Sequence, residues 1–207
     1  MDQHIPWQQR LSDGTAPVQE EIIDQYRAVR DSRSWIPTMI WGTLQTRAYA
    51  SVILRQVVDF LGTPDDVEAG VAARMERQQV LYEPGRHFDV LLGEQALYTN
   101  IGGPAVMAGQ MDRLLADFDQ PTLRLGILPR TAEMPTLPVN AFNLHDNSVV
   151  HVELVSSGLD ITSPDEIALH IKALDLLNDA AVHDDAARAL IEQARTYWRR
   201  ATTIHTS

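Results

Sequence analysis

The chain has 207 residues, of which 44% are hydrophobic and 22% charged, so it is long enough to bury one sizeable core. It contains no cysteine, which excludes a disulfide framework, a thiolate zinc site, an iron–sulfur site and a cysteine nucleophile. Its formal net charge of -11 disfavours duplex DNA as a partner, because DNA-binding surfaces neutralise phosphates with lysine and arginine.

Three helices are predicted in the first part of the chain. The first spans 15–29, where apolar residues recur every three or four positions behind a threonine and a proline. The second spans 46–62, with Thr46 as its N-cap and Gly62 at its end. The third spans 63–75 and starts with a proline and two acids at the positive end of the helix dipole. Because the loops are short, we expect the three helices to pack together.

The middle of the chain predicts a helix and then a sheet. A short apolar run over 88–92 suits a strand or an extended link, and a clean helical stripe follows over 104–118. Apolar residues then alternate with polar ones over 123–127, 142–144 and 150–154. This alternation predicts antiparallel strands that share one sheet.

Two helices are predicted at the C-terminal end, over 163–177 and 184–198. The first of them begins with a capping-box pattern over 163–166, with proline at the first helical position. Strands flanked by runs of helices, without regular βαβ alternation, indicate the α+β class. We therefore expect a helical lead-in and helices packed on a small antiparallel sheet.

The expected organisation is one domain over 1–207, with a lead-in helix region at 1–34, a core at 35–200 and a tail at 201–207. No apolar run approaches the roughly 20 residues that a membrane helix needs. The first ten residues also lack the basic start and apolar middle of a signal peptide. We therefore expect a cytoplasmic protein that does not associate with a membrane.

Motifs that would identify a reaction are missing. There is no G-x-S-x-G, H-E-x-x-H, Walker or G-x-G-x-x-G pattern, so the sequence assigns no catalytic residue. His145 and His151 flank a predicted turn and could approach each other across a hairpin, but no carboxylate stands at a spacing that completes a metal site. We expect no metal. The cofactor stays open, because a single axial haem histidine would leave no spacing to recognise.

One candidate binding cluster lies on the third predicted helix. Arg74, Arg77 and Gln78 share one face at i, i+3 and i+4, which makes a fork of donors for a carboxylate, a phosphate or a buried glutamate. The alternative is a salt-bridged helix surface. We expect Arg77 and Gln78 to face Glu94 or the region of Gln45.

The second candidate cluster is the bend before the second helix. Gly42 allows a bend that other residues would resist, and Gln45 can satisfy backbone groups at the helix start. We expect Trp35 to be a core residue and Trp41 to line a pocket, the alternative being that Trp41 is a second core residue that fills space left at Thr43. The predicted ligand-binding residues are Trp41, Thr43, Gln45, Arg74, Arg77, Gln78 and Glu94.

The segment WIPTMIWGTLQTRAYASVIL resembles P-x-x-x-P-G-L-L-Q-T-x-x-Y-A, which opens the C-terminal effector domain of WhiJ-like actinobacterial regulators. That domain is one of unknown function and usually follows a helix-turn-helix. Further segments resemble the family in order, namely VAARMERQQVL, LLGEQALYTNIGGPAVMAGQMDRLL, LGILP and VVHVEL. The resemblance spans roughly Trp7 to Ala194.

Two departures from the family pattern stand out. Pro-Gly-Leu-Leu-Gln-Thr reads Trp-Gly-Thr-Leu-Gln-Thr over 41–46, and the 34 residues before the motif cannot hold both the lead-in helix and a helix-turn-helix. The resemblance therefore implies an effector-like domain standing alone, which binds a small molecule or a partner regulatory protein and does not bind nucleic acid. Two alternatives remain: an enzyme recruited from this scaffold in specialised metabolism, with or without a cofactor, and a structural module that forms a homodimer.

Overall fold

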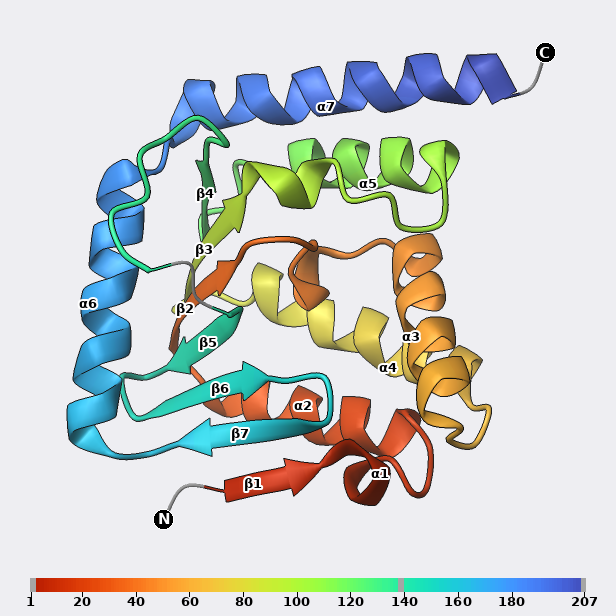
Figure 1. The fold of residues 1–207 in the computed structure, drawn as a ribbon, viewed down its shortest axis with the longest axis vertical. Coiled ribbons are helices and arrows are strands. Elements are labelled where there is room, and N and C mark those ends of the chain that lie inside the picture. Colours follow the sequence, from red (N-terminus) through yellow and green to blue (C-terminus); the bar gives the residue numbers. More distant parts are fainter. Residues whose placement is uncertain (1–2, 138–139, 206–207) are drawn as a thin grey trace.

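The computed structural model describes residues 3–137 and 140–205. Within these residues a seven-stranded sheet runs through the molecule, and helices pack on both of its faces (Figure 1). The strand order is β1-β7-β6-β5-β2-β3-β4. The strands are β1 (Gln3–Pro6), β2 (Asp31–Ile36), β3 (His87–Gly93), β4 (Leu123–Leu128), β5 (Phe142–His145), β6 (Val149–Glu153) and β7 (Ser157–Ile161).

The sheet is mixed, and its character changes at β2. This strand pairs antiparallel with β5 and parallel with β3, which in turn pairs parallel with β4. Parallel neighbours need long crossovers, which helices supply here between β2 and β3 and between β3 and β4. The helices are α1 (Trp7–Arg10), α2 (Ala16–Ala28), α3 (Arg47–Leu61), α4 (Val67–Arg77), α5 (Pro104–Asp117), α6 (Pro164–Ala180) and α7 (Asp184–His205), with short 3-10 turns at Gly42–Leu44, Gln78–Tyr82 and Glu94–Leu97.

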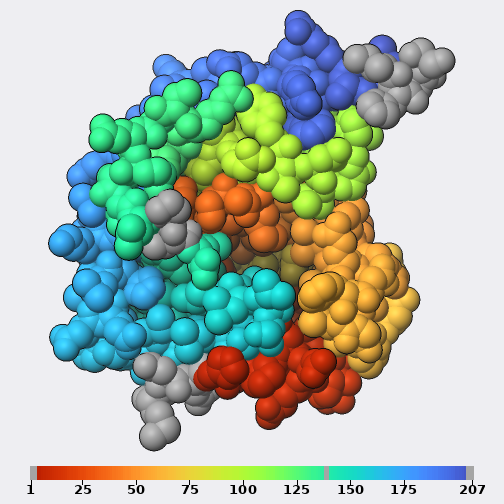
Figure 2. Space-filling view, viewed as in Figure 1, coloured from red at the N-terminus to blue at the C-terminus, as the bar shows by residue number. Residues whose placement is uncertain are grey.

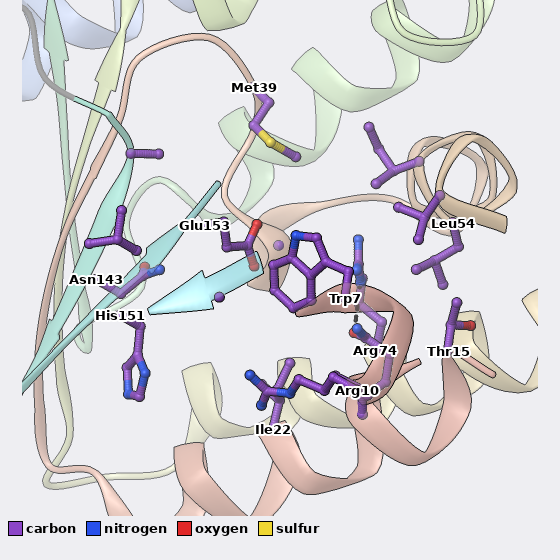
Figure 3. Close-up of a pocket in the computed structure, with 18 of the residues that line it drawn as sticks. Trp7, Arg10, Thr15, Ile22, Met39, Leu54, Arg74, Asn143, His151 and Glu153 are labelled. Atoms are coloured by element: carbon purple, nitrogen blue, oxygen red, sulfur yellow. Dashed lines mark hydrogen bonds between the residues drawn. The ribbon is translucent and has the colours of Figure 1, made fainter. Parts of the chain in front are cut away.

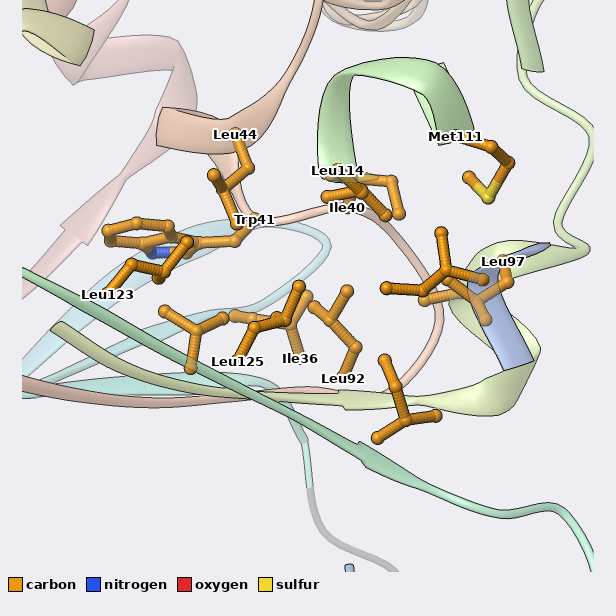
Figure 4. Packing of buried hydrophobic residues seen from close by; sticks show 14 of the residues in the cluster. Ile36, Ile40, Trp41, Leu44, Leu92, Leu97, Met111, Leu114, Leu123 and Leu125 are labelled. Atoms are coloured by element: carbon orange, nitrogen blue, oxygen red, sulfur yellow. The ribbon is translucent and has the colours of Figure 1, made fainter. Parts of the chain in front are cut away.

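Alternation along β2 divides the core into two clusters. Successive side chains of a strand point to opposite faces, so Trp35 and Ile36 leave the sheet in opposite directions. Trp35 joins the buried cluster under α6, while Ile36 joins the larger cluster that α5 and α7 cover. Figure 4 shows this larger cluster, in which side chains from β2 to β4 meet those of the β2–α3 segment and α5. Trp35 is therefore a core residue, as predicted.

The predicted helices are confirmed, with one shifted start. Tyr49 N–H donates to the Thr46 hydroxyl at 3.2 Å, and Gly62 ends α3 in the left-handed conformation at φ 68°. The third predicted helix, α4, begins only at Val67. The acid before it, Asp66, does not bond its own helix with its side chain, because its carboxylate accepts hydrogen bonds at the start of α2.

The predicted α+β class is confirmed, but the expectation of a small antiparallel sheet is wrong. The sheet is large and mixed, because β1, β2 and β7 add to the predicted strands and β2, β3 and β4 run parallel. The expected lead-in region contains β1, α1 and α2 and enters β2, and β1 pairs with β7 at the sheet edge. In the expected tail, α7 continues to His205, and residues 206–207 lie outside the described part. Over the described residues no helix has both the length and the apolar character to cross a membrane.

Candidate functional site

A cavity of about 700 Å³ lies between α2, the β2–α3 segment, α3, α4 and the β5–β7 strands. Its volume is in the range of small-molecule sites. Figure 2 shows the surface hollowed at this place, between the segments near residue 40, α3 and the β6–β7 hairpin. Figure 3 shows its lining, to which α1 adds Trp7 and Arg10.

The sheet contributes a polar wall to this cavity. Asn143, His151 and Asp160 stand side by side on neighbouring strands, because Asn143 pairs with His151 and His151 pairs with Asp160. Their strand neighbours Leu144 and Val150 point to the opposite face and pack under α6. The alternation of polar and apolar residues that predicted these strands therefore also places the polar side chains on the cavity wall and the apolar ones in the core.

The helices contribute apolar walls. Val18 and Ile22 of α2 and Ile53 and Leu54 of α3 line the cavity, together with Met39 of the β2–α3 segment. Figure 3 shows Ile22, Leu54 and Met39 around it. The lining also includes large apolar side chains that are exposed to solvent: Phe60 at 73%, Val155 at 81% and Leu154 at 38%. The cavity therefore combines a polar wall with an apolar mouth.

Two buried arginines of α4 reach the inner part of the cavity. Arg74 is 9% exposed; its Nε donates to Gln19 Oε1 at 3.0 Å and its Nη1 to Gln45 Oε1 at 2.7 Å. Arg77 is 5% exposed, and its guanidinium lies over the Tyr26 ring, with Cζ 5.2 Å from the ring centroid. Within residues 3–137 and 140–205, Arg77 makes no hydrogen bond and neither arginine has a carboxylate within 4.0 Å.

Burial lowers the pKa of both arginines. Burial first, and then the neighbouring charge of Arg77, lowers the pKa of Arg74 to about 9, while the Glu153 carboxylate opposes this shift. Burial also lowers the pKa of Arg77, opposed by Tyr26 and Glu153. Both guanidiniums remain protonated at neutral pH. The inner part of the cavity therefore carries two positive charges without a paired carboxylate.

The histidines His145 and His151 meet across the β5–β6 hairpin, as the sequence suggested. Their ring centroids are 5.1 Å apart, and His151 Nδ1 lies 2.6 Å from Asp160 Oδ1. Burial, followed by the charge of His151, lowers the pKa of His145 to about 4, so this ring is neutral at pH 7. Its Nδ1 is buried without a partner among the described residues. In the same part of the chain no three His, Asp or Glu side chains are grouped to hold a metal ion.

Trp41 has both of the roles that the sequence left as alternatives. It lines the cavity and is buried in the larger core cluster, where its ring packs on Tyr26 and Phe88 with centroids 5.9 and 5.7 Å apart. Its Nε1 donates to Asn143 Oδ1 at 3.1 Å. Trp41 therefore joins the helical core to the polar wall.

The structure brings four of the predicted site residues to the cavity, namely Trp41, Gln45, Arg74 and Arg77. The other three lie elsewhere. Thr43 is buried beside the cavity, and Gln78 lies behind it and donates to the Gln45 backbone carbonyl. Glu94 lines a separate pocket of about 260 Å³, where it accepts a hydrogen bond from Arg130 N at 2.8 Å. Gln78 and Arg74 hydrogen-bond Gln45, and Arg77 lies against Gly42 of the same segment. Among the described residues Glu94 pairs with Arg130 and not with Arg77 or Gln78.

Other cavity residues were missed as site candidates. Gln19 and Tyr26 lie on the first predicted helix and were not predicted as site residues, yet Gln19 accepts a hydrogen bond from Arg74 and the Tyr26 ring lies against the Arg77 guanidinium. The signal for Gln19 was a glutamine next to the apolar stripe at Val18. Asn143 carried no signal, because a polar residue between two apolar strand positions is normally solvent-exposed. The interpretation of Arg74 as part of a salt-bridged surface is wrong, since the residue is buried.

Among solved structures, the similar ones are distant. NucT from Helicobacter pylori matches with 12% identity and a TM-score of 0.43 over 89% of this chain and 99% of that one. Nuc from Salmonella typhimurium, a phospholipase D family member, matches with 10% identity and a TM-score of 0.43 over 89% and 96%. TrmBL2, an archaeal chromatin protein, matches with 10% identity and a TM-score of 0.40 over 89% and 55%. These likenesses are too weak to bear on function.

Comparison at the sequence level is more informative. No curated protein matches the chain significantly. A family model, however, matches residues 20–193, which include α3 to α6 and every cavity residue contributed by them. The chain therefore belongs to the family described as "Domain of unknown function (DUF5753)".

Proposed function

We propose that the chain is a small-molecule-binding domain of the regulatory type. The observation that carries this proposal is the cavity, in which apolar walls surround buried polar atoms that have no partner within the described chain, Arg77 Nε and His145 Nδ1. Buried polar atoms in folded proteins are nearly always paired with protein or water. A cavity of ligand size that presents such atoms is suited to a bound molecule, which would supply the missing partners.

The regulatory part of the proposal is supported by the resemblance to WhiJ-like effector domains. One segment of that resemblance, WIPTMIWGTLQTRAYASVIL, includes Met39, Ile40, Trp41, Gly42 and Gln45 of the cavity lining. Ligand binding at this segment would change the packing of α3, which begins within it. In this proposal, a small molecule alters the surface that a partner regulatory protein or a second copy recognises.

A second candidate function is an enzyme built on the same cavity. It is favoured by the short hydrogen bond between His151 Nδ1 and Asp160, which orients the ring as in a general base, with the ring facing the cavity. Trp41, which replaces a proline of the family pattern, would shape the substrate pocket. The two candidates share a site and differ in what happens to the molecule bound there.

Native mass spectrometry after incubation with a metabolite extract tests the proposed function. We expect the wild-type protein to retain a small molecule, and we expect Ile22→Trp, which fills the cavity from α2, to lose it. The matched control is Ile171→Trp on α6, a partly buried residue that packs on the other face of the sheet. Retention by all three proteins, or by none, would contradict the proposal.

The same experiment separates binding from catalysis. In the binding proposal the retained molecule keeps its mass during prolonged incubation. In the enzyme alternative its mass changes with time, and the His151→Gln variant stops that change while still binding the molecule.

A further inference from the structure

We infer that the ligand of this cavity is an amphipathic anion, whose carboxylate or phosphate is held by Arg74 and Arg77 while its apolar body extends toward the mouth. This inference rests on the proposed function, because it assigns a chemical class to the molecule that the cavity binds. It is carried by the charges, the contacts and the distribution of apolar side chains around the cavity.

The first argument is charge. Arg74 and Arg77 lie one helical turn apart on α4, so their positive charges repel each other, and both are at least nine-tenths buried. Buried charges are normally paired, because removal from water without a partner is costly. In residues 3–137 and 140–205 the pair lacks a carboxylate within 4.0 Å. A bound anion would supply the missing negative charge.

The second argument is that the pair is held in position before any ligand binds. Gln19 and Gln45 fix the Arg74 guanidinium through two hydrogen bonds, and these amide oxygens add no negative charge. Arg77 is placed by the Tyr26 ring and by Gly42, where a side-chain carbon would lie 2.5 Å from Arg77 Nη2. Gly42 thus leaves room for a guanidinium whose donors remain unused. Donors fixed in this way bind an anion without a large ordering cost.

The third argument concerns the other charged groups at the cavity. The Asp160 carboxylate contacts the ring of His151. Arg10 forms an ion pair with Glu21, with 3.4 Å between Arg10 Nη2 and Glu21 Oε1. Glu153 is exposed, and its charge acts on both buried arginines from beyond ion-pair distance, so water screens it. Among the described residues, the positive charges of the cavity without a carboxylate at ion-pair distance are therefore those of the two buried arginines.

The fourth argument identifies the body of the ligand. The walls on α2 and α3 are apolar, and the apolar lining continues to the exposed side chains of Phe60, Leu154 and Val155. A free inorganic anion would leave these surfaces in water. A molecule with an apolar body would cover them and gain the free energy of removing apolar surface from water.

The test is a series of probes that share one chain and differ in head group. Decanoate, decyl phosphate, decanol and decyltrimethylammonium are titrated against the protein, with calorimetry and with the fluorescence of Trp7 and Trp41, which line the cavity. We expect the anions to bind about tenfold or more tightly than decanol, as expected for charge-assisted hydrogen bonds, and the cation to bind most weakly. The tighter of the two anions identifies the head group as carboxylate or phosphate.

Three variants test whether the preference for anions over decanol comes from the two buried arginines. Arg77→Met is expected to remove most of the preference for anions over decanol, because only Arg74 then remains to hold the head group. Decanol should still bind this variant, which shows that the cavity is still folded. Gly42→Ala keeps the charge of Arg77 but displaces its guanidinium, so it should also weaken the binding of both anions. The control Arg10→Met removes a cavity arginine that already has a carboxylate partner, and should leave the preference for anions intact.

Each contrary result overturns the inference. These results are equal affinity for decanol and decanoate, an unchanged preference for anions in Arg77→Met, loss of that preference in Arg10→Met, or no binding of any probe. Inorganic phosphate or acetate binding as tightly as the decyl compounds would overturn the amphipathic part. The proposed function fails separately, when no metabolite is retained or when Ile22→Trp retains it as well.

Discussion

At the scale of single residues, Arg77 combines a cost in stability with the binding role proposed for it. Its guanidinium is buried and makes no hydrogen bond in the described chain. Arginine side chains keep their proton in proteins, so this buried group carries a charge. Arg74, one turn earlier, is buried to a similar degree but has two hydrogen-bond partners. The two residues therefore make a matched pair for separating the cost of a buried charge from the contribution of its contacts.

We predict that Arg77→Met raises the stability of the ligand-free protein by about 1 kcal/mol or more, because an unpaired buried charge is replaced by an apolar side chain of similar length. Arg74→Met should be neutral or destabilising, since it leaves the Gln19 and Gln45 amides without their partner. Urea unfolding of both variants at pH 7 measures the difference. A destabilised Arg77→Met would show that its charge is compensated in the folded protein.

A second residue-scale prediction concerns acid stability. His145 has a pKa of about 4 in the folded protein against an ordinary value of 6.5, because of burial and then the charge of His151. Between these two values the unfolded chain binds a proton that the folded chain does not. Stability is therefore full above about pH 6.5 and falls as the pH is lowered toward 4, by a total of about 3 kcal/mol from this group.

The His145→Gln variant cannot take up this proton, so its stability should fall less over that range. The measurement is urea unfolding at several pH values between 7 and about 4, and the quantity compared is the change of unfolding free energy with pH. His87→Gln is the control, because His87 is exposed on β3. Parallel pH profiles for wild type and His145→Gln would show that His145 is not the titrating group.

At the scale of elements, the contact between the starts of α2 and α4 holds two cavity walls together. The Asp66 carboxylate accepts hydrogen bonds from Thr15 N at 2.8 Å, from the Thr15 hydroxyl at 2.7 Å and from Ala16 N at 2.6 Å. These elements carry Gln19 and Tyr26 on one side and the two arginines on the other. The carboxylate thus fixes the distance across which Arg74 reaches Gln19.

We predict that Asp66→Ala lowers the free energy of unfolding by about 2 kcal/mol, because it removes hydrogen bonds to a charged acceptor and leaves donors at the α2 start unpaired. The control is Asp65→Ala, whose carboxylate is exposed and pairs with Arg55 on the surface, and this variant should be affected less. Thermal and urea unfolding provide the comparison. Equal losses in the two variants would mean that the contact between α2 and α4 adds no stability.

The helices and strands also show which parts of the fold could be predicted from the sequence. The helices were predictable because a period of 3.6 residues is local, as at Met107, Met111 and Leu114, all fully buried. Strand direction was not, because the apolar residues of β4 alternate in the same way whether the neighbouring strand is parallel or antiparallel. The position of β2 was not predicted because four of the six residues in its sequence, DSRSWI, are polar, with Ser32 and Ser34 on the face away from α6.

For the site, spacing identified the arginines but not their environment. A helical spacing of i and i+3 places Arg74 and Arg77 on one face, yet it does not show whether that face is exposed or buried. Burial arises from α2 and the β5–β7 strands, which are distant in sequence. Glu94 was predicted as a partner of Arg77 and Gln78, but the fold places it at another pocket.

At the scale of the whole molecule, the cavity lies where the two halves of the sheet meet. On the face opposite α6, the parallel half presents Phe88, Val90 and Leu125 to the helical core. The antiparallel half presents Asn143, His145 and His151, and this polar surface borders the cavity. The change of direction at β2 therefore coincides with the change from a packed core to a polar surface that borders the cavity.

The last prediction concerns nucleic acid and rests on the charge of the whole chain. With a net charge of -11, binding to duplex DNA would require a segregated basic surface. Arg195, Arg199 and Arg200 form a basic cluster near the C-terminus. Two of them are paired, because Arg195 and Arg199 of α7 lie 3.7 and 2.8 Å from the Asp112 carboxylate of α5. We expect no change in the anisotropy of a labelled duplex at about 1 µM protein, even at low salt where electrostatic binding is strongest. The variant Asp112→Asn frees both arginines and tests whether this pairing is what suppresses binding, while binding by the wild-type protein that weakens as salt is added would contradict the prediction.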